Sequence, residues 1–175
     1  MVDAAIDVVD ERGVEGLTLA AVAARTGVAA PSLYKHVGSL AELRALVGVR
    51  VMEEMIERLT MAVLSRSGDD AVAVLMHTCR DYALEHPARY AVMPPDPLQN
   101  PATAAAGARL LDVFLAVLRG YGLEGSAAIH ATRSLRVIVH GFVSIEAAGG
   151  FGLPEDLADT YEHLIGMFLA SLSDM

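Results

Sequence analysis

Residues 18–37 read TLAAVAARTGVAAPSLYKHV and carry the clearest structural signals in the chain. Thr18 is a hydroxyl residue placed to cap a short helix, which the alanine-rich segment predicts over Leu19–Arg25. Gly27 interrupts this helix, because glycine readily adopts the left-handed conformation that ends helices. A second helix is predicted over about Pro31–Val37, since proline is tolerated in the first turn of a helix. The stretch therefore predicts two short helices joined by a tight turn.

This pair of helices has the features of a helix-turn-helix. Such a unit needs a small residue where the helices cross and a glycine with positive φ at the turn, and Ala23 and Gly27 meet these needs. Val28 and Leu33 offer the apolar contacts that would hold the second helix against the first. The second helix of such a unit can lie in the major groove of DNA. A DNA-binding head is therefore a hypothesis that these residues raise by themselves.

The rest of the chain has helical periodicity almost throughout, so we expect an all-α fold. Ser39 and Glu42 form a capping box at the start of a long helix. Residues 93–97, which include three prolines, indicate a rigid connector rather than a helix. The helix predicted over Ala127–Ala148 is apolar over much of its circumference, and a final helix opens at Pro154. Helices of this kind are buried on more than one side.

Composition narrows the class of protein. The chain has 175 residues, a formal net charge of −9 and 54% hydrophobic residues, which is enough for a sizeable core. Cys79 is the single cysteine, which excludes an intrachain disulfide framework and a multi-cysteine zinc site. The sequence has no apolar run long enough for a membrane span and no basic segment typical of a secretory signal. We expect a compact, soluble, cytoplasmic protein.

Charge is unevenly distributed along this acidic chain. Residues 1–24 carry one arginine against five acids. Residues 25–50 carry four cations against the single acid Glu42, and the four are Arg25, Lys35, Arg44 and Arg50. Because phosphate contacts need positive charge, this basic segment keeps a DNA-binding head possible in spite of the net charge.

The sequence resembles the TetR family of transcriptional repressors most sharply over residues 2–47. The residues that carry the resemblance are Gly13, Leu17-Thr18, Ala23, Gly27-Val28, Leu33-Tyr34-Lys35-His36-Val37 and the helix start at Ser39–Leu43. Residues 140–146, with Gly150-Phe151, resemble a subgroup of TetR ligand-binding domains that has a His-Gly-Phe motif. Relatives in that subgroup often carry a tryptophan before this motif, and many relatives carry a polar or basic arm before the first helix. The sequence has no tryptophan, so it departs from the subgroup at that position. It also lacks such an arm, from which we expect a truncated N-terminus.

The resemblance implies a homodimer whose two heads read a pseudo-palindromic operator, with a small-molecule effector bound elsewhere. It implies a helix-turn-helix head over residues 1–46 and a helical ligand-binding and dimerisation domain over 47–175. In the family, the residues at the positions of Thr18, Tyr34, Lys35 and His36 contact phosphates, and those at 29–32 face base edges. The predicted DNA-binding residues are therefore Thr18, Val28, Ala29, Ala30, Pro31, Ser32, Tyr34, Lys35 and His36. Leu40 stands where the family typically has a lysine, so one phosphate contact is missing.

Several residues have a plainer interpretation beside the functional one. Tyr34 and His36 could be ordinary surface and packing residues, although the whole pattern favours DNA contact. Arg133, Arg136 and His140 share one side of an apolar helix and could meet an anionic ligand. We favour positions beside a helix-end carboxylate or on the solvent rim of a dimer, because buried charges are usually paired.

Signatures of catalysis are missing from the sequence. It contains no glycine-rich phosphate loop, no Gly-x-Ser-x-Gly elbow and no paired-carboxylate signature, so we expect neither an enzyme nor catalytic residues nor a cofactor. The five histidines beyond residue 50 lack the spacing of a helical zinc site, which makes a metal unexpected. Cys79, on an apolar helix face, is predicted to be an inert buried thiol.

Two functions therefore stand beside each other. The first is a ligand-responsive repressor that dimerises through its last two helices, whose apolar surface exceeds what one small body can cover. The alternative is a helical small-molecule-binding protein whose head does not read DNA. Methionines, Phe114, Phe142 and Tyr82 could line a ligand pocket or fill the core. The sequence predicts neither the effector and its pocket residues, nor the operator, nor whether transcription is repressed or activated.

Overall fold

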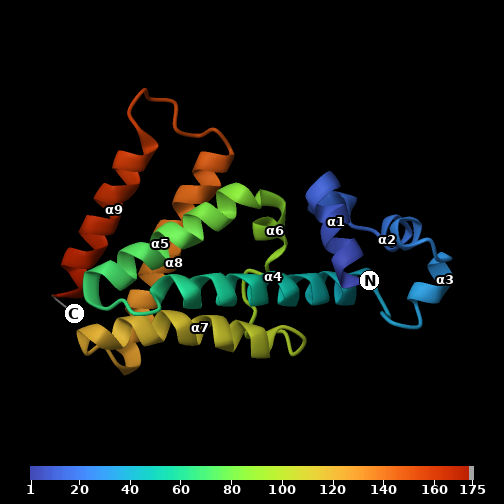
Figure 1. Ribbon diagram of the computed structural model, residues 1–175, viewed down its shortest axis with the longest axis horizontal. Helices are drawn as coiled ribbons and strands as arrows, with labels where there is room; N and C mark the ends of the chain where they lie inside the picture. The colour runs from blue at the N-terminus through green and yellow to red at the C-terminus, as the bar shows by residue number, and fades with distance from the viewer. Residues whose placement is uncertain (174–175) are drawn as a thin grey trace. The chain divides into compact units, whose positions relative to one another are not determined.

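The computed structural model describes residues 1–173, apart from the side chain of Ala30, and this part of the chain is all-helical without strands (Figure 1). The α-helices are α1 (Val2–Arg12), α2 (Leu19–Thr26), α3 (Ala30–Leu33), α4 (Leu40–Val63), α5 (Gly68–Glu85), α6 (Pro87–Val92), α7 (Ala104–Leu118), α8 (Gly125–Ala147) and α9 (Leu157–Leu172). Two short 3₁₀ turns, η1 (Val14–Gly16) and η2 (Arg119–Tyr121), follow α1 and α7. The predicted fold class is confirmed. Over the described residues, no helix is long and apolar enough to cross a membrane.

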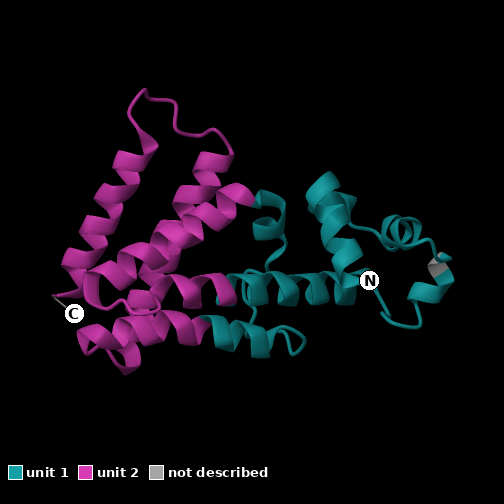
Figure 2. Cartoon of the chain, in the orientation of Figure 1, with its two compact units in different colours: residues 1–56, 86–110 teal, residues 57–85, 111–175 magenta. Residues whose placement is uncertain are grey.

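The chain packs into two compact units (Figure 2). Unit 1 comprises residues 1–56 and 86–110, and unit 2 comprises residues 57–85 and 111–175. Helices α4 and α7 each contribute residues to both units. This division describes packing, and the functional boundary between residues 46 and 47 stays a prediction.

Helix caps in unit 1 follow the sequence closely. The Thr18 hydroxyl oxygen accepts a hydrogen bond of 3.1 Å from the backbone N–H of Ala21. Gly27 ends α2 in the left-handed conformation, with φ 70°, as the turn requires. The Ser39 hydroxyl accepts from the N–H of Glu42 at 3.1 Å. The Glu42 carboxylate accepts from the N–H of Gly38 at 2.7 Å, so the reciprocal half of the capping box reaches one residue earlier than the motif predicts.

The second helix of the helix-turn-helix is shorter than predicted. It covers Ala30–Leu33 rather than extending to Val37, and Tyr34 to His36 form turns. The N–H of His36 bonds to the carbonyl of Leu33 at 2.8 Å, an i to i−3 bond that tightens the backbone. Val37 is 1% exposed, so its burial in the core coincides with the departure of the chain from the helix.

Helix α6 is an element that the sequence analysis missed. It begins at Pro87, directly after α5, and its end meets the proline connector. Gly48 in α4 allows this segment to approach closely, because a Cβ there would lie 3.2 Å from Cδ of Pro94. The connector over residues 93–97 is not helical, as predicted.

Unit 2 is built on α5, α8 and α9, which pack against one another. The buried residues of these helices include Val72, Leu75, Met76 and Cys79 on α5, Leu135, Val139, Phe142 and Val143 on α8, and Tyr161, Ile165, Phe168 and Leu172 on α9. The hydroxyl of Tyr161 donates a hydrogen bond of 2.8 Å to the carbonyl of Met76. A fully buried tyrosine therefore has a partner for its one polar group.

Candidate nucleic-acid interface

The predicted DNA-binding residues lie on unit 1, in and around α3. Tyr34 is 59% exposed and Val28 is 43% exposed. Five of the remaining residues are also exposed, namely Thr18, Ala29, Pro31, Lys35 and His36. Ser32 is half-buried. The side chain of Ala30 lies outside the described residues. The structure thus brings seven of the nine predicted residues to the surface in α3 and the turns beside it, and it places Thr18 at the start of α2.

Buried neighbours hold this surface in place. Leu33 is 4% exposed and Val37 is 1% exposed, and they flank the exposed segment of Tyr34, Lys35 and His36. The backbone N–H of Val28 bonds to the carbonyl of Ala23 at 3.1 Å, which fixes the turn before α3. Tyr34 and His36 are consequently not packing residues of the core.

Acidic residues of α1 engage an arginine of the head. Arg25 lies 3.2 Å from Asp7 and forms a hydrogen-bonded ion pair with Glu11. The hydrogen bond to Glu11 raises the pKa of Arg25 above its usual value. Arg25, a cation of the basic segment, is therefore already paired with carboxylates of the same chain.

An ion-pair hub centred on Arg89 connects three helices of unit 1. The Arg89 guanidinium on α6 donates to Asp10 on α1 at 2.9 and 2.6 Å and to Glu54 on α4 at 3.0 Å. The bond from Arg89 lowers the pKa of the Asp10 carboxyl. These ion pairs of Arg89 with Asp10 and Glu54, which we call the Arg89 clamp, hold α1 of the head against α4 and α6.

Unit 2 contains a partly buried ion pair that sequence reasoning did not find. The Arg80 guanidinium donates to Glu146 at 2.9 and 2.6 Å, and the two side chains are 14% and 13% exposed. It also lies over the rings of Phe142 and Tyr161, at 5.3 and 5.1 Å from their centroids. The hydrogen bonds to Glu146 raise the pKa of Arg80. The available signal was a charge on an otherwise apolar face of each partner helix.

The cations that the sequence analysis did single out lie elsewhere. Arg133, Arg136 and His140 are all exposed on α8. This placement is unlike a buried anion site, and the favoured positions beside a helix-end carboxylate or on the solvent rim of a dimer stay predictions. Cys79 is buried, and desolvation raises the pKa of its thiol to about 12, which fits the predicted inert thiol.

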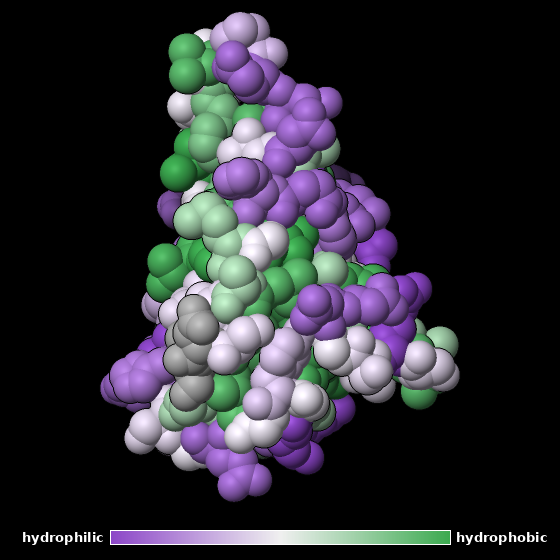
Figure 3. Space-filling model, turned by 90° about the vertical axis from the view of Figure 1, so that its left-hand side faces the viewer, coloured by the Kyte–Doolittle hydropathy of each residue, from purple (hydrophilic) through white to green (hydrophobic). Residues whose placement is uncertain are grey.

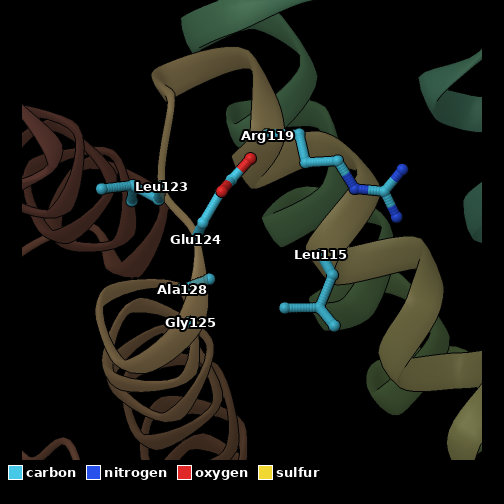
Figure 4. Close-up of a pocket in the computed structure, with 6 residues that line it drawn as sticks. All are labelled: Leu115, Arg119, Leu123, Glu124, Gly125 and Ala128. Atoms are coloured by element: carbon cyan, nitrogen blue, oxygen red, sulfur yellow. The ribbon is translucent and has the colours of Figure 1, made fainter.

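A small open pocket lies where α7 ends and α8 begins (Figure 4). Its volume is about 270 Å³, and the residues that line it are Leu115, Arg119, Leu123, Glu124, Gly125 and Ala128. Leu115 lies on α7, and the Glu124 carboxylate points toward the turn that carries Arg119, whereas the Leu123 side chain points away from both (Figure 4). The pocket lies entirely within unit 2.

Comparison with known proteins decides the family. Residues 1–46 match the model for bacterial regulatory proteins of the tetR family, and residues 72–168 match a tetracyclin repressor-like C-terminal domain. The chain is 38% identical to an uncharacterized HTH-type transcriptional regulator of Mycobacterium tuberculosis, over 85% of this chain and 69% of that protein. It is 34% identical to the uncharacterized HTH-type transcriptional regulator YobS of Bacillus subtilis, over 98% of this chain and 90% of that protein.

The chain belongs to the TetR family of transcriptional regulators. Solved structures agree with this fold at lower identity. A Rhodococcus protein of unknown function superposes with a TM-score of 0.81 at 19% identity, covering 98% of this chain and 93% of that one. A TetR variant from Acinetobacter baumannii in complex with minocycline gives 0.73 at 20% identity, covering 99% and 94%.

Membership of the TetR family establishes the class of activity. TetR regulators bind DNA operators and small-molecule ligands, and this protein is a DNA-binding, ligand-responsive transcriptional regulator. Regulators of this kind are not enzymes. The assignment to the subgroup with a His-Gly-Phe motif stays a prediction.

Proposed function

We propose that this TetR-family protein is a repressor that binds a palindromic operator as a homodimer and leaves it when an effector binds. The observation that carries the proposal is the exposed surface around α3, in which Tyr34 and Lys35 project beside the buried Leu33 and Val37. An exposed tyrosine beside a lysine suits contact with phosphates, since both side chains donate hydrogen bonds. An operator-binding repressor acts where the chromosome lies, so we place it in the cytoplasm.

The chemistry of this surface suggests how bases are read. We assign phosphate contacts to Thr18, Tyr34, Lys35 and His36 and base-edge contacts to residues 29–32. The base-facing set carries one hydroxyl, that of Ser32, and otherwise apolar side chains. Apolar side chains recognise the methyl group of thymine in the major groove. We therefore expect half-sites in which thymine occupies the directly read positions.

We assign dimerisation to the outer faces of α8 and α9. Val137 on α8 is 71% exposed and Met167 on α9 is 62% exposed, and Ile129 and Ile145 add to the α8 face. A groove on α9 is lined by Asp159, Glu162, His163, Gly166, Met167 and Ala170. Figure 3 shows green apolar side chains among purple polar ones on the side of unit 2 where the chain ends. A large apolar side chain exposed on each of two long helices supports burial by a second copy.

Charge on the two helices fits the same arrangement. The exposed face of α8 carries Arg133, whereas the groove on α9 carries Asp159 and also Glu162, which lies 2.8 Å from His77 of the same copy. In a two-fold dimer the same patch of both copies meets, so the cation of one α8 can approach the Asp159 position on α9 of the second copy. We place the effector in unit 2, and the pocket between α7 and α8 is a first candidate for its entry.

Selection of DNA tests the proposal. Purified protein is mixed with a pool of random duplex DNA at moderate salt, and the retained sequences are determined. We expect enrichment of a palindrome with two half-sites about one helical turn, or a multiple of it, apart. A folded dimer that enriches no sequence would contradict the proposal and favour a ligand-binding protein whose head does not read DNA.

A further inference from the structure

Positive charge near the reading surface is scarce, because the helices of unit 1 use most of their arginines internally. Arg25 on α2 is paired with Asp7 and Glu11. Arg50 on α4 lies 3.9 Å from Asp3 and 3.8 Å from Glu54. A guanidinium already facing carboxylates brings little net charge to a phosphate. These two arginines of the basic segment are therefore poor candidates for DNA contact.

Arg44 differs from both. It is exposed on α4, and among the residues that the structure describes it has no ion pair and no side-chain hydrogen bond. It stands one helical turn after Leu40, which is half-buried and has no charge to offer. The hydrogen bond from Gly38 to the Glu42 carboxylate ties the turn after Val37 to this first part of α4. Arg44 thus lies at the end of α4 that joins the α3 surface.

Arg12 is the other arginine of the head without an ion pair among the described residues, and its position is different. It follows Asp10 by two residues, and Asp10 shares the Arg89 guanidinium with Glu54. Glu54 lies ten residues beyond Arg44 on α4, which is about 15 Å at 1.5 Å per residue. Arg12 is therefore near the far part of α4, away from its first turns.

We propose that Arg44 binds a phosphate of duplex DNA and, with Lys35, supplies the positive charge of each reading head. This inference rests on the proposed function. A guanidinium presents several N–H donors in a plane that matches the oxygens of a phosphate. A phosphate contact fixes the position of the protein on the duplex and carries no sequence information directly. Arg44 would add affinity equally on every duplex.

Salt dependence of binding tests the proposal. The affinity of the wild type, Arg44→Gln and Arg44→Lys is measured between 50 and 200 mM salt, on the selected operator and on a random duplex. Each neutralised phosphate contributes about 0.9 to the slope of log K against log salt concentration. We expect Arg44→Gln to lower the slope by about 1.8 per dimer, so that its affinity falls about 12-fold less over this range. Arg44→Lys should keep most of the slope.

Arg50→Gln is the matched control, because it removes the same charge from the same helix at a residue that faces carboxylates. The slope of Arg50→Gln should equal that of the wild type. In Arg44→Gln, the ratio of operator affinity to random-duplex affinity should equal the wild-type ratio. An Arg44→Gln dimer with wild-type helix content and a wild-type slope overturns the role of Arg44 alone. An equal loss in Arg50→Gln also overturns it, since net charge then explains the effect. A wild type that binds neither duplex overturns the proposed function together with it.

Discussion

Among single residues, Tyr34 has a large exposed ring whose hydroxyl could bind a partner. An aromatic ring 59% exposed beside the buried Leu33 contributes little to the core. A phenolic hydroxyl can donate to a charged phosphate oxygen, and hydrogen bonds to charged groups are the stronger ones. Because Tyr34 is exposed while its neighbours are buried, its substitution should affect DNA binding without affecting the stability of the fold.

We predict that Tyr34→Ala lowers operator affinity at least about tenfold, since one hydrogen bond to a charged group contributes about 1.5–3 kcal/mol. The free energy of unfolding should change by less than about 0.5 kcal/mol, as for other surface substitutions. Fluorescence anisotropy and urea denaturation measure the two quantities. Leu153→Ala, which removes a side chain 78% exposed in the loop before α9, should change neither. Full operator affinity in Tyr34→Ala would remove Tyr34 from the site.

The partly buried ion pair of Arg80 and Glu146 is expected to contribute to the free energy of unfolding of unit 2. Removing one partner leaves the other charge partly buried and unpaired, which costs about 1–3 kcal/mol. We expect Arg80→Met to destabilise unit 2 strongly and the double variant Arg80→Met with Glu146→Leu to recover much of the loss. Urea denaturation of the two single variants and the double variant measures the coupling. Additive losses would show that the pair does not act as a unit.

At the scale of elements, the Arg89 clamp joins α1, α4 and α6 through carboxylates. The lowered pKa of Asp10 means that the folded state prefers its ionised form. The stabilisation is complete above the usual pKa of about 3.9 and is lost as pH falls through the lower folded value. Because the pair is partly exposed, we expect an effect of about 1 kcal/mol or less.

We predict that Asp10→Asn flattens the acid limb of the stability curve. Urea denaturation from pH 6 down to pH 3 should show a smaller loss of unfolding free energy than in the wild type. Asp112→Asn, which removes an exposed carboxylate on α7, is the control and should leave the curve of the wild type in place. An acid limb of wild-type steepness in Asp10→Asn would show that the clamp does not contribute.

Element prediction succeeded where local signals were strong and failed where tertiary packing decides. The caps at Thr18 and Ser39 and the turn at Gly27 follow from side-chain chemistry within a few residues. The early end of α3 coincides with burial of Val37, and the packing of α6 depends on the space above Gly48. Neither is visible in a local pattern. The ion pair of Arg80 and Glu146 spans 66 residues, so sequence periodicity could not pair them.

For the whole molecule, the proposed reading of an operator requires two copies of the chain. The exposed apolar residues of α8 and α9 belong to faces that one copy leaves open. A dimer would also double the number of phosphate contacts and thereby the salt dependence of binding. Oligomeric state and DNA binding are therefore coupled properties in this proposal.

We predict that Val137→Glu or Met167→Glu yields a monomer at micromolar concentration, because a carboxylate would be buried in the proposed interface. Sedimentation equilibrium measures the mass. Met61→Glu is the matched control, since this α4 side chain is 70% exposed and outside α8 and α9. The control should remain a dimer. If both interface variants remain dimers, the dimer interface must lie on a surface other than the outer faces of α8 and α9.

In the proposed complex, two copies of the α3 surface read one operator together, and a change in the spacing of the half-sites tests this coupling. The affinity of the wild type is measured for the selected palindrome and for the same palindrome with five base pairs inserted at its centre. The insertion turns one half-site to the opposite side of the duplex while keeping every base of each half-site. We predict that affinity falls to that of random duplex. Equal affinity for both duplexes would contradict reading by two coupled heads.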